Sequence, residues 1–371
     1  MSIKFYFNFF KTIMNTFWTD IGVKSTFKIK KMKLISFATK FLHYLPSELS
    51  HFIALNGLKI LYNLGILRYF IGNQVSLKND VNNLSNLQEK LKMPKLSNRL
   101  GFAAGLDKNG EYIDCLASLG VGFIEVGTVT PRPQKGNAKP RILRNRKDKS
   151  ILNRLGFNNK GVDKLVKRLK TRKTNIVIGV SLGKNFDTPN ELAYKDYLEC
   201  MEKVYEFSDY LAVNISSPNT KGLRALSEKA VLGKLLIEIK NKQRSLANTF
   251  GYKPIFIKLS PDEDSRGMKD ICDLIQEHNI DGIISTNTTI QHEDEKGRGG
   301  ISGSPLFKLS TEKLIEARKL IGSDLPIIAS GGVMNAQDFY EKITSGADLV
   351  QIYSGFIFEG PKLVKDVLNK N

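Results

Sequence analysis

The stretch YLAVNISSPN, residues 210–219, is an apolar run that ends abruptly in Asn214, two serines, Pro218 and Asn219. Seven more runs of this kind occur along the chain: GFAAGLDK (101–108), FIEVGTVT (123–130), IVIGVSLGKN (176–185), IFIKLSPD (255–262), GIISTNTT (282–289), PIIASGGV (326–333) and LVQIYSGF (349–356). Amphipathic segments of helical length separate them, such as STEKLIEARKLI (310–321). Strands alternating with helices predict a parallel sheet, and eight repeats are typical of a (β/α)8 TIM barrel. A doubly wound sheet is the minor alternative, because it typically uses fewer strands.

We expect four parts in the chain. Residues 1–45 form a basic, apolar N-terminal extension, residues 46–72 a helical segment, residues 73–98 a linker, and residues 99–371 the barrel. The helical segment begins PSELSHFIALNG, with Pro46 and Ser47 as the helix start. Its apolar face is broad and must be buried against something.

The formal charge of +19 allows a nucleic-acid, membrane or anionic-ligand partner. Residues 1–45 hold eight lysines and a single acidic residue, Asp20, among many Phe and Ile residues. This mixture is typical of a segment that lies on anionic lipid, and a poorly ordered tail is the alternative. No stretch of about 18 residues is free of charge, so we expect no transmembrane helix. We expect peripheral membrane association and no nucleic-acid partner. The first arginine is Arg68, and because mitochondrial transit peptides are rich in arginine, this argues against a transit peptide at the N-terminus.

The polar residues that end the eight runs define the candidate site, because active sites of such barrels lie at the C-terminal ends of the strands. The set contains lysines, amides, hydroxyls and glycines, and it lacks a carboxylate pair, a metal cluster or a histidine triad. The chain has only four histidines, and none of them ends one of the eight runs, so the sequence does not favour a Ser-His-Asp hydrolase. These groups can bind a polar planar anion and a phosphate, but demanding chemistry requires a cofactor. The three cysteines lack metal spacing and suit free thiols in a reducing compartment.

Glycine-rich segments indicate the kind of cofactor. ASGGV and YSGF end the last two runs, and the loop GRGGISGSP (297–305) supplies more glycines. Phosphates in these barrels commonly bind after strands seven and eight, where glycine lets the backbone approach the anion. No GxGxxG motif opens a helix after the first strand, so a tightly bound nicotinamide dinucleotide is not indicated.

Together with residues 46–70, the barrel closely resembles the class 2 dihydroorotate dehydrogenases, which are membrane-associated flavoenzymes of pyrimidine synthesis. The matching stretches include GFAAGLDKNG, VGTVTPRPQ, NRLGFNN, NISSPNT, KLSPD, STNTT, GGISG, IIASGG and VQIYSGFIF, in order along the chain. The resemblance implies FMN as cofactor, dihydroorotate as hydride donor, orotate as product and a ubiquinone-type quinone as acceptor. It also implies that residues 46–72 form a quinone channel, on the cytoplasmic face of a bacterial inner membrane rather than in a mitochondrion.

The resemblance also assigns site residues. The expected FMN-binding residues are Ala103, Ala104, Gly105, Leu106, Asp107, Thr128, Ser181, Asn185, Asn214, Lys258, Thr286, Gly303, Gly332, Tyr353 and Ser354. The expected substrate-binding residues are Lys108, Asn153, Arg154, Leu155, Gly156, Phe157, Asn214, Ser217, Asn219, Asn287 and Thr288. Ser217 matches the catalytic base, Thr220 is expected to pass its proton on, and Lys258 is expected beside the flavin. His51, Arg144 and Tyr353 are expected near the quinone head. Ser181 stands where the family usually has asparagine, which puts its contact with FMN in doubt.

Two other functions compete with this one. A soluble class 1 relative that uses fumarate or NAD would lack residues 46–70 and would carry a cysteine in place of Ser217. A non-catalytic, membrane-binding barrel would show losses among the strand-end residues, and only Ser181 departs from the pattern. A flavin spectrum separates an enzyme from such a barrel.

Overall fold

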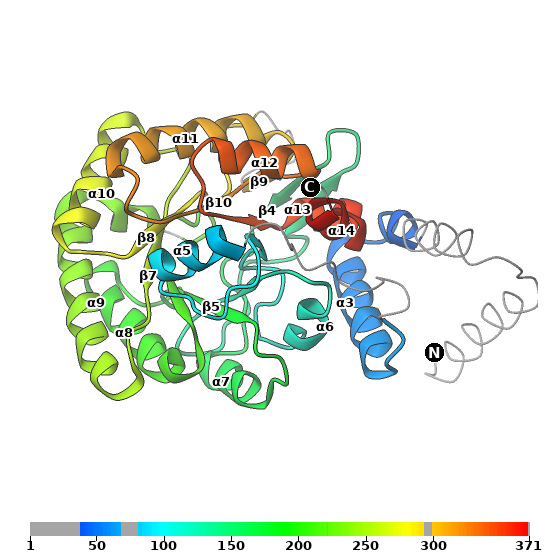
Figure 1. Cartoon of the computed structure of the whole chain (residues 1–371), viewed down its shortest axis with the longest axis horizontal. Coiled ribbons are helices and arrows are strands. Elements are labelled where there is room, and N and C mark those ends of the chain that lie inside the picture. The colour runs from blue at the N-terminus through cyan, green and yellow to red at the C-terminus, as the bar shows by residue number, and fades with distance from the viewer. Residues whose placement is uncertain (1–37, 68–80, 221, 293–298, 370–371) are drawn as a thin grey trace, which may run out of the picture.

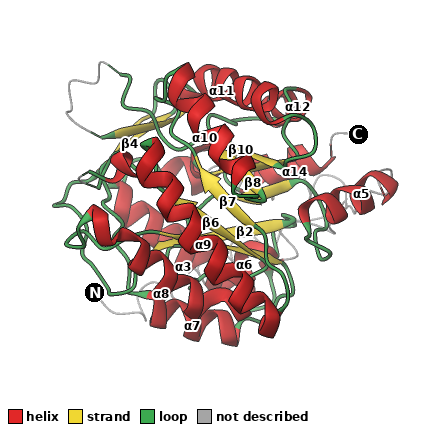
Figure 2. Cartoon of the chain, turned by 90° about the vertical axis from the view of Figure 1, so that its left-hand side faces the viewer, coloured by secondary structure: helices red, strands yellow, loops and turns green. Residues whose placement is uncertain are grey.

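The computed structural model describes residues 38–67, 81–220, 222–292 and 299–369, with side chains from residue 84 onward in the second range. Eight parallel strands form a closed barrel in the order β1-β11-β10-β8-β7-β6-β5-β2 (Figures 1 and 2). Their bounds are β1 (Leu100–Phe102), β2 (Phe123–Val129), β5 (Val177–Leu182), β6 (Tyr210–Asn214), β7 (Ile255–Lys258), β8 (Gly282–Ser285), β10 (Ile327–Ser330) and β11 (Leu349–Ile352). Each predicted run contains or overlaps one of these strands, so the predicted TIM barrel is confirmed.

Burial explains why these runs are almost continuously apolar. Every residue of all eight barrel strands is buried, because side chains on one face fill the barrel and those on the other face contact helices. The helices that follow the strands are α6 (Ile113–Ala117), α7 (Val162–Thr171), α8 (Ala193–Val204), α9 (Lys229–Phe250), α10 (Ser265–Glu277), α11 (Leu306–Ile321), α12 (Ala336–Thr344), α13 (Ser354–Glu359) and α14 (Pro361–Asn369). Three short 3-10 helices are η1 (Asn190–Leu192), η2 (Tyr205–Phe207) and η3 (Leu223–Ser227).

A second sheet covers the C-terminal end of the barrel, and the sequence did not predict it. It is antiparallel and has the order β3 (Ile142–Asn145), β4 (Ser150–Asn153) and β9 (Gly300–Gly303). The glycine-rich segment 297–305, expected to be a loop, therefore contains a strand. Glycine has a low strand propensity, so β9 depends on its backbone pairing with β4, where Ser150 lies opposite Gly303.

The N-terminal end of the barrel is closed by a helix inside the range expected to be a linker. Helix α5 (Val81–Leu91) and the residues after it place Leu87, Leu91 and Met93 against Phe123 and Phe256 at the bottom of the barrel. Salt bridges of Lys90 with Asp348, Lys92 with Asp281 and Lys95 with Asp209 surround this apolar contact. The structure thus differs from the expected linker, because residues 84–96 pack as part of the core.

The predicted N-terminal helix is α3 (Ser47–Asn63), which begins directly after Pro46 as expected. It packs beside α6 and β3 and lies outside the ring of barrel helices (Figure 1). Leu55 is buried, whereas Phe52 is 61% exposed and Ile60 is 58% exposed. Only part of its apolar face is therefore covered by the residues that the structure describes. Across the described ranges, no helix combines the length and hydrophobicity needed to cross a bilayer. Most of the expected basic extension, residues 1–37, and residues 68–80 lie outside the described residues.

Candidate active site

A pocket of about 940 Å³, measured with its open mouth, lies at the C-terminal ends of the barrel strands. Most of the expected site residues line it: Ala103, Ala104, Gly105, Lys108, Thr128, Asn153, Leu155, Gly156, Phe157, Asn214, Ser217, Asn219, Lys258, Thr286, Asn287, Thr288, Gly303, Gly332, Tyr353 and Ser354. Eight expected residues do not line it: His51, Leu106, Asp107, Arg144, Arg154, Ser181, Asn185 and Thr220.

The ends of β6 and β8 form the side-chain-rich half of the pocket. Asn287 Nδ2 donates to Asn214 Oδ1 at 3.3 Å and to Ser216 Oγ at 3.1 Å. Asn219 Nδ2 donates to Asn153 Oδ1 at 3.0 Å, which links the loop after β6 to the end of β4. Four amides thus converge in one pocket, and amides offer both donors and acceptors to a polar ring.

Ser217 lies in the middle of this half and is almost buried, at 7% exposure. Its Oγ accepts a hydrogen bond from the Asn219 backbone N–H at 3.3 Å. Thr220, three residues further on, has a buried Oγ1 with no hydrogen-bond partner among the described residues. A buried hydroxyl without a protein partner has the capacity to bind water or pass a proton.

Lys108 supplies a cation at the end of β1. Its Nζ donates to Asn158 Oδ1 at 2.6 Å. Burial, together with a smaller effect of the nearby charge of Arg141, lowers the pKa of Lys108 to about 7, and the charge of Glu48 opposes this shift. A lysine that is costly to charge in the free protein gains most from an anionic ligand.

Lys258, at the end of β7, lies next to a polar cluster inside the barrel that the sequence did not reveal. Its Nζ is 3.7 Å from Oε1 of Glu125, a side chain with 0% exposure. Glu125 Oε2 accepts hydrogen bonds from Tyr210 at 3.0 Å and from Gln351 at 2.7 Å. Because a buried ion is stable only when it is paired and hydrogen-bonded, Glu125 fixes Lys258 toward the pocket. Both Glu125 and Gln351 lie within apolar runs, and only the closed barrel brings them together.

The glycine-rich half is formed by β9 and the ends of β10 and β11. At Gly332, with φ +77°, a Cβ would lie 2.3 Å from Phe307 Cα, and at Gly303, with φ +94°, it would lie 2.1 Å from the Lys149 carbonyl oxygen. Ser354 Oγ donates to or accepts from Ser302 Oγ at 2.8 Å beside them. Helix α11 begins just after Gly303, and its first residue, Leu306, lines the pocket. Close-approach glycines, hydroxyls and a helix start suit a phosphate group, so the residues present fit a phosphate-bearing cofactor.

Two of the expected cofactor-binding residues, Ser181 and Asn185, do not line the pocket and contact other residues instead. Ser181 Oγ is 2.9 Å from Thr128 Oγ1, which also accepts from Asn214 Nδ2 at 3.0 Å. The Asn185 side chain is bonded to Arg132 and Gln134 on the loop after β2. The doubt about Ser181 is consistent with this arrangement, because its described hydroxyl contact is with Thr128 rather than with the pocket.

Other expected residues have structural partners. The Asp107 carboxylate accepts the backbone N–H groups of Glu111 and Tyr112 and so supports the start of α6. Burial raises the pKa of Asp107 to about 6, against the effect of these hydrogen bonds. Leu106 is buried in the core, and Arg154 Nε donates to the Pro140 carbonyl at 3.2 Å.

The three residues expected near a quinone lie on the side of the barrel that faces α3. Tyr353 lines the pocket, where Gly105 packs against its ring, and burial raises its pKa to about 12. His51 on α3 is hydrogen-bonded to the Leu106 backbone, and burial followed by the charge of Lys108 lowers its pKa to about 4. Arg144 Nη1 donates to the Leu42 carbonyl at 3.4 Å. His51 on α3 therefore contacts the loop after β1, and Arg144 contacts the residues just before α3. Neither of them lines the pocket.

Sequence reasoning missed part of the wall. Ser302, Ser330, Gly331, Val333, Gln351 and Gly355 also line the pocket. All of them except Gln351 stand inside the glycine-rich motifs already singled out, so including every residue of each motif in the prediction would have found these five.

The family model described as dihydroorotate dehydrogenase matches residues 86–370. A relative from Aliivibrio salmonicida, named dihydroorotate dehydrogenase (quinone), is 49% identical over 282 residues, which cover 74% of this chain and 84% of the relative. A relative of the same name from Methylobacillus flagellatus is 44% identical over 341 residues, which cover 90% of this chain and 98% of the relative. The structure of an Eimeria tenella DHODH in complex with ferulenol superposes with a TM-score of 0.75 at 34% identity, covering 87% of this chain and 89% of that one. The chain belongs to the dihydroorotate dehydrogenase family.

Proposed function

We propose that the chain oxidises (S)-dihydroorotate to orotate, with FMN as its resident cofactor and a membrane quinone as the final electron acceptor, in the synthesis of UMP. The observation that carries this proposal is the convergence of Lys108, Ser217 and Lys258 in one pocket with four asparagines and a glycine-rich wall. The relatives carry the quinone-dependent name, which supports the choice of acceptor. None of the three cysteines lines the pocket, so the cysteine base of a class 1 enzyme has no counterpart among the described residues.

FMN, when bound, supplies the hydride-accepting chemistry that no side chain here provides. Gly303, Gly332 and Ser354 would hold its phosphate. Thr128, Asn214 and Lys258 would contact its ring end, where the Lys258 charge favours the arrival of negative charge. These contacts divide the pocket into a cofactor half and a substrate half.

The substrate half would bind and deprotonate dihydroorotate. Lys108 would pair with the carboxylate, and the asparagines would satisfy the ring N–H and C=O groups. Ser217 Oγ would accept the C5 proton while the C6 hydride leaves the substrate. A serine is a weak base, so it needs an exit for this proton, and the unpartnered hydroxyl of Thr220 is placed to take part in that exit.

The quinone would approach along α3. Leu49, Phe52 and Ile60 on α3 are between 46% and 61% exposed, which is typical of a helix that lies against lipid. His51 lies on this helix, Arg144 contacts the Leu42 carbonyl shortly before it, and Tyr353 lines the pocket. We therefore place the protein as a peripheral protein on the cytoplasmic face of a bacterial inner membrane.

A flavin experiment tests the redox proposal. The purified protein should show a flavin absorption spectrum with one FMN per chain, and anaerobic dihydroorotate should bleach it with release of orotate. Addition of a quinone should restore the colour, whereas fumarate or NAD should not. A colourless protein that cannot be reconstituted with FMN would refute the proposal, and recovery by fumarate or NAD would indicate the class 1 reaction.

Surface substitutions test the membrane part. The double variant Phe52→Glu, Ile60→Glu should lose binding to anionic liposomes and slow the reduction of long-chain quinone, while dihydroorotate still bleaches the flavin. Ile237→Glu is the matched control, because Ile237 is 47% exposed on α9, away from α3. Equal liposome binding by the double variant and the control would remove α3 from the membrane contact.

A further inference from the structure

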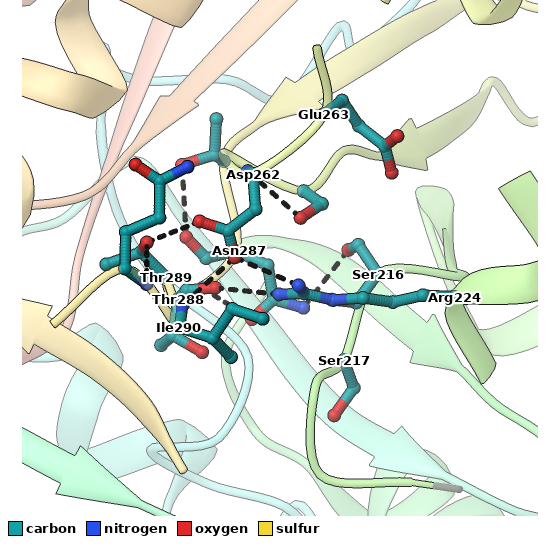
Figure 3. A network of polar contacts seen from close by, with 12 residues as sticks. Ser216, Ser217, Arg224, Asp262, Glu263, Asn287, Thr288, Thr289 and Ile290 are labelled. Carbon is teal, nitrogen blue, oxygen red and sulfur yellow. Dashed lines mark hydrogen bonds and ion pairs between the residues drawn. The ribbon is translucent and has the colours of Figure 1, made fainter. Parts of the chain in front are cut away.

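Arg224 lies in η3, directly after the loop that carries Ser217, and it contacts three separate segments. Its Nε donates to the Ser216 carbonyl at 3.2 Å, and its Nη2 donates to the Thr288 carbonyl at 3.3 Å. Its Nη1 forms an ion pair with Asp262 Oδ2 at 2.9 Å. Figure 3 shows the guanidinium between the loops that follow β6, β7 and β8. One side chain thus joins the C-terminal ends of three adjacent strands.

Asp262 completes this connection from the loop after β7. Its Oδ1 accepts a short hydrogen bond from Thr289 Oγ1, and its Oδ2 accepts the Ile290 backbone N–H at 3.0 Å. The Asp262 side chain is 9% exposed and that of Arg224 is 23% exposed, so solvent screens the pair weakly. Planar, charge-assisted contacts of this kind restrict geometry more than single hydrogen bonds do.

The contacts of Arg224 fix the backbone on both sides of the substrate half. The Ser216 carbonyl belongs to the peptide unit that leads into Ser217, and the Thr288 carbonyl follows the substrate-facing Asn287. Among the described residues, the Ser217 hydroxyl has one hydrogen bond, from Asn219 N–H. In Figure 3 the Ser217 side chain points away from the guanidinium, so Arg224 acts through the backbone and does not contact the reacting atoms.

Resting on the proposed function, we propose that Arg224 and Asp262 form a positioning pair that holds the Ser217 hydroxyl against the C5 carbon of the substrate. A displacement of about 1 Å costs about 100-fold in rate. Loss of the pair should therefore slow proton removal at C5, without affecting the glycine-rich cofactor half or the reoxidation of the flavin.

The test uses full-length, FMN-loaded variants Arg224→Met and Asp262→Asn in anaerobic stopped-flow experiments. We expect flavin reduction by dihydroorotate to slow by about 30- to 100-fold in Arg224→Met, while quinone reoxidation stays within twofold. Substrate deuterated at C5 should give a larger isotope effect than in the unmodified protein, whereas the C6 isotope effect should not grow. Asp262→Asn keeps the shape of the side chain and should give the same pattern to a smaller degree.

Arg318 provides a matched control at the opposite end of the barrel. It pairs with Asp348 at 2.8 Å, it also donates to backbone carbonyls, and Asp348 accepts the Ile327 N–H. Arg318→Met should lower thermal stability as much as Arg224→Met does, with unchanged flavin reduction and isotope effects. A second check places Arg224→Met in a Ser217→Ala background, where a residue that acts through Ser217 causes no additional slowing.

Two results would overturn the inference. One is a folded Arg224→Met protein with native reduction rate and isotope effects, and the other is equal slowing of both half-reactions with equal growth of both isotope effects. If the unmodified protein is not reduced by dihydroorotate at all, the proposed function fails instead, so the two failures are distinguishable.

Discussion

The cofactor half and the substrate half of the pocket are built from different kinds of residue. In the cofactor half, Gly303 and Gly332 let the backbone pack so closely against Lys149 and Phe307 that a Cβ would collide with them. In the substrate half, Asn214, Asn287 and Ser216 bond to one another, and charged residues hold their loops from behind. The first half therefore depends on backbone packing that only glycine permits, and the second depends on side chains that keep one another in place. A substitution in the cofactor half should therefore lower FMN affinity, and one in the substrate half should slow flavin reduction or weaken orotate binding.

Ser217→Ala should give the largest effect and should be confined to the substrate half. Removal of the base is expected to slow flavin reduction by about 100- to 10,000-fold, because general base catalysis contributes that much. Quinone reoxidation should stay nearly unchanged in stopped-flow traces. Equal slowing of both half-reactions would assign Ser217 a structural role and would contradict the separation of the pocket into two independent halves.

Gly332→Ala should damage the cofactor half alone. The left-handed backbone costs an alanine about 1 to 2 kcal/mol, and its Cβ would collide with Phe307, so FMN affinity should fall by about 30-fold or more. Recovery of FMN fluorescence on dissociation measures this. Gly322→Ala is the control, because Gly322 has a similar φ of +72° and no atom within 4 Å of the added Cβ. If both variants lose FMN equally, backbone strain rather than close approach explains the loss.

Orotate affinity should depend on pH through Lys108. Burial lowers the pKa of Lys108 to about 7, and the anion binds the charged form, so binding takes up a proton above that pH. The dissociation constant should therefore rise by up to about tenfold per pH unit between pH 7 and 8.5. Titration of the flavin spectrum with orotate measures it. The Lys108→Met variant should bind weakly with no such slope, and a flat profile in the unmodified protein would contradict the role of Lys108.

The smallest effect is expected at the contact between α3 and the substrate half. Glu48 on α3 pairs with Arg141 Nε at 3.0 Å, Arg141 Nη1 donates to the Asn137 carbonyl at 3.2 Å, and Asn137 Nδ2 donates to the Asn219 carbonyl at 3.1 Å. Glu48→Gln should lower the free energy of unfolding by about 1 kcal/mol and weaken orotate binding by about two- to threefold.

Thermal unfolding and orotate titration check this prediction for Glu48. Asp187→Asn is the control, because it breaks the exposed Arg132–Asp187 pair and should change neither quantity measurably. Weaker FMN binding in Glu48→Gln with unchanged orotate binding would show that α3 supports the cofactor half instead.

The sequence predicted the barrel because each strand is buried on both faces and so leaves a continuous apolar run. Strand ends alone predicted part of the pocket, such as Lys108, Ser217 and Lys258, because parallel strands deliver their C-terminal residues to one end, and the resemblance to the dihydroorotate dehydrogenases supplied most of the other residues. The sequence could not predict β9, whose glycines favour no strand until β4 offers a partner, or the Glu125 cluster, whose members are more than 80 residues apart. Arg224 follows the NISSPNT stretch by four residues, but its role depends on contacts with Asp262 and Thr288 that only the folded chain provides.

The closed bottom of the barrel has a consequence for synthesis on the ribosome. Lys90 and Lys92 leave the ribosome early, yet their partners Asp348 and Asp281 follow 258 and 189 residues later. At about 5 to 20 residues per second, the wait for Asp348 lasts roughly 13 to 50 s. During that time the apolar residues of α5 have no barrel to cover, and such long-range closure is slow. The nascent chain therefore exposes the hydrophobic bottom of the barrel until its last strand is made, and this is the period in which it is most prone to aggregation.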